Sequence, residues 1–297
     1  MKFHIWSGSH IIKKSDFEKG LKSLQKLGFE YEVSAKVKNY SIKNQTPLLP
    51  FLAGSDLLKV QEFLKIADNA KANWLLASRG GYGCLRLLKL LDEAPMQRNQ
   101  NLHVWGYSDL TVLQLYLWQR KGWFYVQGPL LGSDSLVKPK KEELNTLQNV
   151  AKFGIFPSQF KVKALNKHLT LPKSEPFLFL GGNLASIVSM LGTPWEPRPL
   201  QDFVLFLEDI DEAAYRTDRL LTQLKNSRFF DKCRGIVLGH FTKSPDYLKI
   251  FKALSTELRL PVYSGIPMGH QAPRIPLIMG KEIIFDGPHL LYSDASS

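Results

Sequence analysis

Hydrophobic and polar residues follow two alternating rhythms over residues 1–131. Apolar residues that recur every three or four positions predict helices over 17–27, 57–64 and 85–91. Between them lie short runs that are either apolar throughout or alternate with period two, as buried strands do. These runs are FHIW at 3–6, FEYEVS at 29–34, NWLLAS at 73–78 and LHVW at 102–105. Strands that alternate with helices predict a mostly parallel sheet with right-handed helical crossovers.

The same rhythm resumes after residue 175. Strand-like runs are FLFL at 177–180, FVLFLE at 203–208, GIVLGH at 235–240 and PVYSGIPMGH at 261–270. Helical spacing is present over 184–191, 213–224 and 246–258. The pair Asp286-Gly287 stands between EIIF and HLLYS, and this arrangement predicts a hairpin turn.

Residues 132–175 break the rhythm. They contain several prolines, many lysines and no clear period, so we interpret them as an inter-domain linker that carries a helix and a strand. The predicted fold is therefore α/β with two domains. Residues 1–131 form a mostly parallel, Rossmann-like or flavodoxin-like sheet with helices on both faces, and residues 176–297 form a smaller α/β domain.

Composition is that of an ordinary globular protein and excludes several classes. The chain has 297 residues, 44% of them hydrophobic, and no run approaches the ~18 apolar residues of a transmembrane helix. We expect no signal peptide, no membrane insertion and a cytoplasmic location. The two cysteines, Cys84 and Cys233, lack the spacing of a metal site, which excludes a disulfide scaffold or a zinc ribbon.

The net charge of +12 invites comparison with nucleic-acid-binding proteins. The lysines are scattered, however, and the densest groups, KPKKEE and KVKALNK, lie in the irregular segment. We therefore interpret the charge as a solvated basic surface and predict no nucleic-acid partner.

Polar residues that follow predicted strands are the candidates for chemistry, since ligands of open α/β sheets bind beyond the carboxyl ends of the strands. Ser108, in WGYSDL, lies between a predicted strand and a predicted helix. It is either the cap of that helix or a nucleophile on a sharp elbow, and Asp109 could equally provide the cap. The match to G-x-S-x-G is partial, because Leu110 occupies the place of the last glycine.

A second candidate is RGGYG at 79–83, directly after the strand NWLLAS. It is either a tight turn or a place where exposed backbone N–H groups bind an anion or an oxyanion. It is neither a Walker loop nor a dinucleotide-binding motif. Cys84, at the start of the next helix, is interpreted as a small buried residue and not as a nucleophile.

Acids and histidines at strand ends complete the set. Glu208 ends FVLFLE and Asp209 follows it directly, and no further ligand cluster accompanies these acids, so we predict no metal site. His240 and His270 each follow a strand, and a lone loop histidine is usually structural. Together, Ser108, Glu208 and His270 have the chain order of the α/β-hydrolase triad, in which a carboxylate orients the base that activates the serine.

Several motifs together resemble the LD-carboxypeptidases, serine peptidases of the muramoyltetrapeptide carboxypeptidase type that include the microcin C immunity protein. They follow the family's order from about residue 51 to residue 280. The motifs are FLAGSD, RGGYGCLRLL, GYSDLT, GGNLASIVSMLGTPWEP, LFLEDIDEAAYRTDRLLTQL, GIVLGHF and GIPMGHQAPRIPLIMG. The last motif departs from the family pattern, because Gln271 follows the histidine and Arg274 lies nearby, and the start FHIWSGSH is also atypical.

The resemblance implies an active site between the two domains with a Ser–His–Glu triad. The nucleophile corresponds to Ser108 in GYSD, the carboxylate to Glu208 in LED and the base to His270 in MGH. The oxyanion hole corresponds to the N–H of Asp109 and to that of a glycine in RGGYG, which we assign to Gly81. It implies neither a metal nor a cofactor.

The resemblance also implies the substrate. Members of the family remove the terminal D-alanine from L,D-linked muropeptide tetrapeptides in the cytoplasm during peptidoglycan recycling, usually as homodimers. An enzyme that removes a C-terminal residue should bind the free carboxylate of that residue, and the guanidinium of an arginine can do so through two parallel hydrogen bonds. Arg79, Arg86 and Arg274 are the candidates, and Tyr82 completes the predicted substrate contacts.

Two alternatives stay open. One is a microcin-immunity-type peptidase that cleaves aminoacyl-nucleotide conjugates, for which Trp105, Trp123 or Trp195 would form an aromatic slot. The other is a non-catalytic homologue that only binds muropeptides. The presence of all three triad residues argues against the second alternative.

Overall fold

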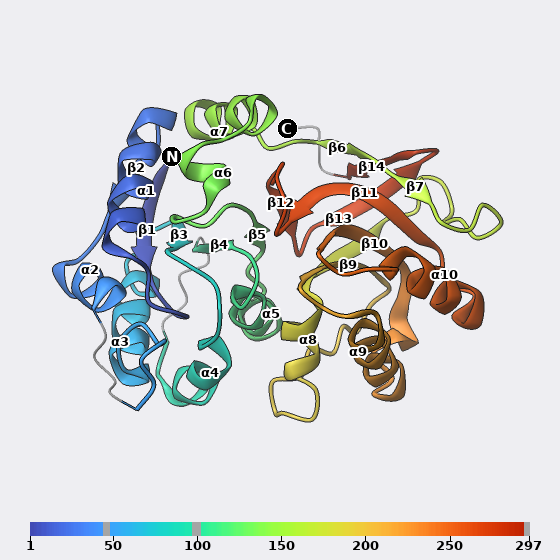
Figure 1. The fold of residues 1–297 in the computed structure, drawn as a ribbon, viewed down its shortest axis with the longest axis horizontal. Coiled ribbons are helices and arrows are strands. Elements are labelled where there is room, and N and C mark those ends of the chain that lie inside the picture. Colours follow the sequence, from blue (N-terminus) through green and yellow to red (C-terminus); the bar gives the residue numbers. More distant parts are fainter. Residues whose placement is uncertain (44–47, 97–101, 294–297) are drawn as a thin grey trace.

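A computed structural model of the chain describes residues 1–43, 48–96 and 102–293 and contains two α/β bodies that lie side by side (Figure 1). Each body has its own β-sheet with helices packed against it, so the predicted two-domain α/β fold is confirmed. In these three ranges, no helix has both the length and the apolarity to cross a membrane.

The first sheet has six strands in the described residues, in the order β12-β5-β4-β3-β1-β2. Five of them are parallel, and their order 2-1-3-4-5 is that of the predicted flavodoxin-like sheet. β12 comes from the C-terminal part of the chain and pairs antiparallel with β5. The strands are β1 (Lys2–Trp6), β2 (Glu30–Glu32), β3 (Trp74–Ala77), β4 (His103–Gly106), β5 (Tyr125–Gln127) and β12 (Leu277–Met279).

Apolar side chains are buried on both faces of this sheet. Successive strand residues point to opposite faces, so Leu75 and Ala77 of β3 belong to one hydrophobic cluster and Leu76 to another. Burial on both faces explains why these strands read as continuous apolar runs. The helices of this body are α1 (Lys14–Leu27), α2 (Ala35–Ile42), α3 (Asp56–Ala67), α4 (Cys84–Glu93) and α5 (Leu110–Lys121).

The second sheet has eight strands among the described residues, in the order β6-β14-β13-β8-β9-β10-β11-β7. The four central strands, β8 to β11, are parallel, and the outer strands are added antiparallel. The predicted turn at Asp286-Gly287 is confirmed, because β13 and β14 pair around it. The strands are β8 (Phe177–Asn183), β9 (Phe203–Ile210), β10 (Cys233–Thr242), β11 (Val262–Gly269), β13 (Glu282–Asp286) and β14 (His289–Tyr292). The helices are α8 (Leu184–Ser189), α9 (Ala214–Asn226), η1 (Phe229–Lys232) and α10 (Tyr247–Leu258).

The segment 132–175, predicted as a linker with one helix and one strand, holds two of each. Helices α6 (Asp134–Val137) and α7 (Lys141–Phe153) pack against α1 of the first body. Strands β6 (Gln159–Lys161) and β7 (Lys163–Ala164) form the two edges of the second sheet. This segment therefore contacts both bodies and is not a free connection.

Candidate active site

Ser108 lies on a sharp turn between β4 and α5, at the carboxyl edge of the first sheet. Its φ of 65° is uncommon for a residue with a side chain, because the Cβ crowds the backbone in this region. Strain of this kind persists only where the surrounding structure enforces it, and it is concentrated at active sites. The cap alternative for Ser108 is wrong, since Asp109 occupies the N-cap position of α5. The geometry is that of a nucleophile elbow.

Asp109 occupies the N-cap position of α5, but its side chain bonds elsewhere. The carboxylate Oδ2 accepts hydrogen bonds from the backbone N–H of Cys84, the first residue of α4, at 2.9 Å and from the hydroxyl of Ser9. The expected side-chain cap on α5 is therefore wrong, because the carboxylate turns toward α4. This buried contact ties the Ser108 elbow to the glycine-rich turn that precedes α4.

The glycine-rich turn after β3 lies against the elbow. A Cβ at Gly80 would stand 3.0 Å from the Ser108 Oγ, so a side chain here would crowd the hydroxyl. Gly81 has a φ of 112°, and a Cβ there would meet the His10 ring at 2.5 Å. No described residue accepts a hydrogen bond from the backbone N–H of Gly81 or of Asp109. Both N–H groups thus meet one requirement of the predicted oxyanion hole, since neither is bonded within the described residues.

We expect Asp109→Ala to lower the free energy of unfolding by about 1–3 kcal/mol, because it leaves the buried Cys84 N–H unpaired. Urea denaturation followed by circular dichroism measures this change. The control is Asp231→Ala, which removes an exposed ion pair with Arg228 and should cost less than about 0.5 kcal/mol. Equal stabilities of the two variants would contradict a structural contact between Asp109 and α4.

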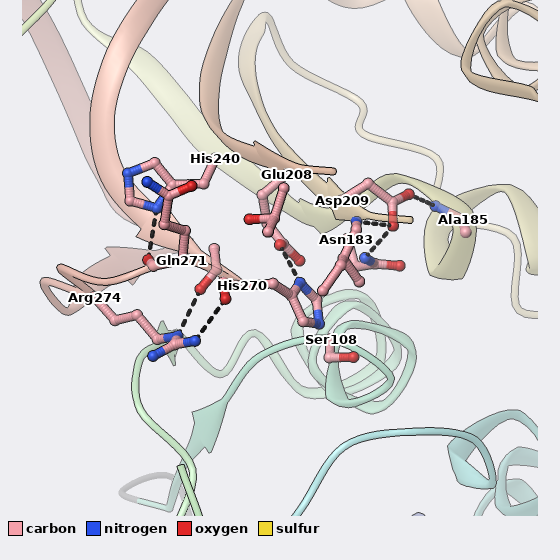
Figure 2. A network of polar contacts seen from close by, with 12 residues as sticks. Ser108, Asn183, Ala185, Glu208, Asp209, His240, His270, Gln271 and Arg274 are labelled. Atoms are coloured by element: carbon pink, nitrogen blue, oxygen red, sulfur yellow. Dashed lines mark hydrogen bonds and ion pairs between the residues drawn. The ribbon is translucent and has the colours of Figure 1, made fainter. Parts of the chain in front are cut away.

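The predicted acid and base lie at the ends of two strands of the second sheet. Glu208 is in β9 and His270 directly follows β11, and parallel strands bring their carboxyl ends to one edge of a sheet. His270 Nδ1 lies 2.7 Å from Oε2 of Glu208, whose side chain is completely buried. Nε2, on the other side of the imidazole ring, takes part in no hydrogen bond with the described residues, and in Figure 2 it faces the end of the ring at which Ser108 is drawn.

The surroundings of His270 have opposing effects on its pKa. Burial lowers the pKa, whereas the charge and hydrogen bond of Glu208 and the charge of Asp209 raise it. The positive charge of Arg274 lowers it again. The net result is a pKa above the ordinary value of a histidine. A raised pKa favours the imidazolium that forms when the ring accepts a proton.

Ser108 and His270 line one cleft of about 550 Å³. The ring of Tyr107 stands edge-on to that of His270, with 4.9 Å between centroids, and so connects the elbow to the base. The structure thus places Ser108 and His270 on the lining of one cleft, with the buried Glu208 bonded to the ring. The other lining residues are Ile12, Lys13, Asp16, Ser78, Arg79, Gly80, Gly81, Tyr107, Leu130, Gly132, Ser133 and Ile210.

Three residues predicted to contact the substrate are not part of this lining. Arg86 is paired with Asp56, with nitrogen–oxygen distances of 2.7 and 2.8 Å. Arg274 is buried, and its guanidinium donates to protein oxygens. Tyr82 is exposed and does not line the cleft. Of the three candidate arginines, Arg79 is the one that lines the cleft.

The tryptophans considered for a nucleobase slot also lie away from the cleft. Trp105 and Trp123 are buried in the hydrophobic cores, and Trp105 Nε1 donates to the Pro129 carbonyl at 3.0 Å. Trp195 packs against the larger hydrophobic cluster, which includes residues of both bodies. Among the described residues, therefore, no tryptophan lines the cleft.

Asn183 and Asp209 form a connection behind the site that sequence reasoning missed. Asp209 accepts a hydrogen bond from the Asn183 side-chain amide at 2.9 Å (Figure 2). The Asn183 backbone N–H donates to Thr111 Oγ1 at 3.0 Å. These bonds link α5, which follows the elbow, to the strand of Glu208. Burial and the charge of Glu208 raise the pKa of Asp209 to about 7. The sequence feature that could have identified Asn183 is its position between an apolar strand and a predicted helix.

Comparison with known proteins finds relatives over most of the chain. A murein tetrapeptide carboxypeptidase of Pseudomonas aeruginosa is 30% identical over 253 residues, 81% of each chain. The crystal structure of a muramoyltetrapeptide carboxypeptidase from Oxalobacter formigenes is 26% identical, with a TM-score of 0.80 over 100% of both chains. The microcin C7 self-immunity protein MccF of Escherichia coli is 25% identical over 307 residues, 93% of this chain and 87% of MccF.

The fold and these relatives define a serine-type carboxypeptidase built from two α/β domains. Residues 4–128 match the LD-carboxypeptidase N-terminal domain, and residues 178–284 match the LD-carboxypeptidase C-terminal domain. The chain belongs to the LD-carboxypeptidase family, and the resemblance found in its motifs is confirmed.

Proposed function

We propose that this protein hydrolyses the bond between an L-centred residue and the terminal D-alanine of murein tetrapeptides. The observation that carries the proposal is the strained Ser108 elbow, in the cleft that it shares with His270. The ring of His270 is in turn held by Glu208. Family membership supports the reaction class, and relatives named for murein tetrapeptides support the substrate.

Acylation of the enzyme is the first half of the proposed reaction. Glu208 holds Nδ1 of His270, so Nε2 can accept the hydroxyl proton of Ser108. The serine oxygen attacks the carbonyl of the L-residue, and the N–H groups of Gly81 and Asp109 stabilise the oxyanion. The N-terminus of α5 adds a partial positive charge at the same place. His270 then protonates the nitrogen of D-alanine, which leaves.

Deacylation is the second half. His270 removes a proton from a water molecule, whose oxygen attacks the ester carbonyl on Ser108. The same backbone N–H groups stabilise the second oxyanion. When this intermediate collapses, His270 returns the proton to the serine oxygen, and the tripeptide leaves with a free carboxylate. Every proton is transferred by His270, so the sequence of steps needs no metal or cofactor.

We further propose that Arg79 binds the carboxylate of the leaving D-alanine. Its side chain lines the cleft and is positioned by a 2.7 Å hydrogen bond from Nη1 to the Ile11 carbonyl. We expect Arg79→Met to raise KM about 10- to 100-fold with little change in kcat, because a charge-assisted bidentate contact is lost. Steady-state kinetics with the tetrapeptide measures the effect.

A matched substrate sharpens this test. A tetrapeptide ending in D-alanine amide lacks the carboxylate, so its KM should already be high and should not change in Arg79→Met. The control variant is Arg234→Met, which breaks the exposed ion pair between Arg234, in β10, and Asp202. A KM increase in Arg79→Met that is the same for acid and amide would show that Arg79 does not contact the carboxylate.

The decisive experiment compares substrates. The purified protein is incubated with L-Ala-D-Glu tetrapeptides that carry diaminopimelate or lysine before D-alanine, and released D-alanine is measured. An aminoacyl-sulfamoyl nucleotide is tested in parallel. Release of D-alanine supports the proposal. Cleavage of the nucleotide conjugate alone would assign a microcin-immunity-type activity, and binding without turnover of any substrate would assign a binding protein.

We also propose that the protein acts in the cytoplasm, without nucleic acid, as a homodimer. Cys84 and Cys233 are both free and buried, which is compatible with a reducing compartment. The family resemblance supports the dimer. Light scattering coupled to size-exclusion chromatography tests it directly, and a mass near 33.8 kDa would assign a monomer.

A further inference from the structure

The loop that carries His270 is held by side-chain hydrogen bonds at four successive carbonyl groups. Such bonds are stronger than neutral ones when the donor is charged. The pairs are Arg274 Nε to Gly269 O (2.8 Å), Arg274 Nη2 to His270 O (2.6 Å), His240 Nδ1 to Gln271 O (2.7 Å) and Lys140 Nζ to Ala272 O (3.2 Å). Arg274 thus bonds the carbonyl of the base itself and that of the residue before it (Figure 2).

Arg274 is also bonded to the segment between the two sheets. Its Nη1 donates to the Ser135 hydroxyl of α6 at 2.6 Å, and its backbone N–H donates to the Glu143 carboxylate of α7 at 2.7 Å. Ser135 and Glu143 are buried, and α6 and α7 pack on α1 of the first body. Arg274 therefore joins the histidine loop of the second body to α6 through its guanidinium and to α7 through its backbone N–H.

Tyr107 connects Arg274 and His270 to the turn that carries Ser108. The guanidinium carbon of Arg274 lies 5.8 Å from the centroid of the Tyr107 ring, and that ring packs against His270. Tyr107 immediately precedes Ser108 in the elbow. Elbow, base and arginine therefore form one packed unit, although they come from β4, from the end of β11 and from the loop after it.

We propose that Arg274 is a positioning residue that fixes the imidazole of His270 between Glu208 and Ser108. This inference rests on the proposed function. The loop begins at Gly269, whose φ of 137° is a conformation that favours glycine, so the backbone there has little restraint of its own. A displacement of a catalytic group by about 1 Å can cost about 100-fold in rate. Two bonds from one rigid guanidinium fork to neighbouring carbonyls prevent such a displacement.

Arg274 also influences the proton affinity of the base. Glu208 and Asp209 of β9 and Arg274 act on the pKa of His270, and Tyr107 packs against its ring. His240 and Lys140 bond the two carbonyls that follow His270, and the charged residues in the same cleft are Lys13, Asp16 and Arg79. The acids raise the pKa of His270, and Arg274 lowers it. Removal of the guanidinium should therefore raise the pKa of His270 and move the ascending limb of the pH–rate profile to higher pH.

The test compares Arg274→Met with Arg274→Lys. We expect Arg274→Met to lower kcat about 100-fold, with KM within about threefold of the wild type, and to shift the ascending limb to higher pH. Arg274→Lys keeps the charge but cannot bond both carbonyls as a planar fork, so we expect about a tenfold loss of kcat without a pH shift. Arg234→Met is the matched control and should change neither quantity.

A second variant tests the positioning role of Arg274 without removing a charge. Ser135→Ala removes the acceptor of Arg274 Nη1 and should lower kcat about three- to tenfold at unchanged KM. Circular dichroism and thermal unfolding verify that each variant is folded. Added guanidinium should restore part of the kcat of Arg274→Ala but not that of Ser108→Ala. Rescue of this kind would not follow from a general loss of stability.

Two measurements separate this proposal from the choice of substrate. NMR titration of His270 gives its pKa, and the rate of Ser108 labelling by a fluorophosphonate reports on the base, both without a peptide. A slower labelling rate and a higher pKa in Arg274→Met support the positioning role even if no tetrapeptide is cleaved. Wild-type kcat, labelling and pKa in a folded Arg274→Met would overturn it. An increase in KM alone would instead assign Arg274 to substrate binding.

Discussion

Ser108→Ala is expected to lower kcat for D-alanine release by about 10⁴-fold or more, because the acyl-enzyme can no longer form. The substrate contacts proposed at Arg79 and at the glycine-rich turn are unchanged by this substitution. The variant should therefore still bind the tetrapeptide with an affinity near the wild-type value. Released D-alanine and the equilibrium binding of tetrapeptide by calorimetry measure the two quantities separately.

The control for this experiment is Ser227→Ala. The Ser227 hydroxyl donates to the Leu224 carbonyl at the end of α9, so its loss should leave the activity unchanged. Mass spectrometry of rapidly quenched wild-type enzyme should detect a tripeptidyl ester, and Ser108→Ala should lack it. D-Alanine release that persists in Ser108→Ala would falsify the assignment of the nucleophile.

Glu208→Gln is expected to lower kcat by about 10³- to 10⁴-fold with an intact fold. The amide has nearly the same shape as the carboxylate, but it carries no charge to stabilise the imidazolium of His270. It can also present an N–H to Nδ1 and so favour the wrong tautomer of the ring. Steady-state kinetics, with thermal unfolding to verify folding, measures this loss.

The same substitution should move the pH dependence in a defined direction. Burial lowers the pKa of His270, and Glu208 is the main group that raises it. In Glu208→Gln the pKa should therefore fall, and the residual activity should rise at a lower pH than in the wild type. This shift is opposite to that expected for Arg274→Met. The control is Glu257→Gln. Glu257 lies on α10 and forms an exposed ion pair with Lys225, so its substitution should change neither kcat nor the pH profile.

Local patterns identified much of the fold. The apolar runs at 3–6 and 102–105 correspond to β1 and β4, and the spacing over 17–27 lies within α1. Sequence analysis missed β5 and β12 and expected one strand where β6 and β7 lie, and none of these four strands has more than three residues. Their burial comes from neighbours that are distant in the sequence, and so few residues show no period of their own.

The candidate substrate contacts also depended on residues that are distant in the sequence. Sequence reasoning counted Arg86 and Arg274 as free to bind a substrate, because an unpaired arginine and a paired one look alike in a sequence. In the tertiary structure, Asp56 forms an ion pair with Arg86. Four protein oxygens accept hydrogen bonds from Arg274, three from its guanidinium and one from its backbone N–H. Partners supplied by other elements thus decided which arginine faces the cleft.

The sequence by itself determined two α/β units and three residues of suitable chemistry at strand ends, Ser108, Glu208 and His270. These features depend on near neighbours along the chain, namely strand and helix periodicity and the residue types at each turn. Tertiary structure decided the positive φ of Ser108, the 2.7 Å contact of His270 with Glu208 and the bonds that Arg274 makes to the histidine loop. Each of these depends on packing between elements far apart in the sequence, which no local pattern records.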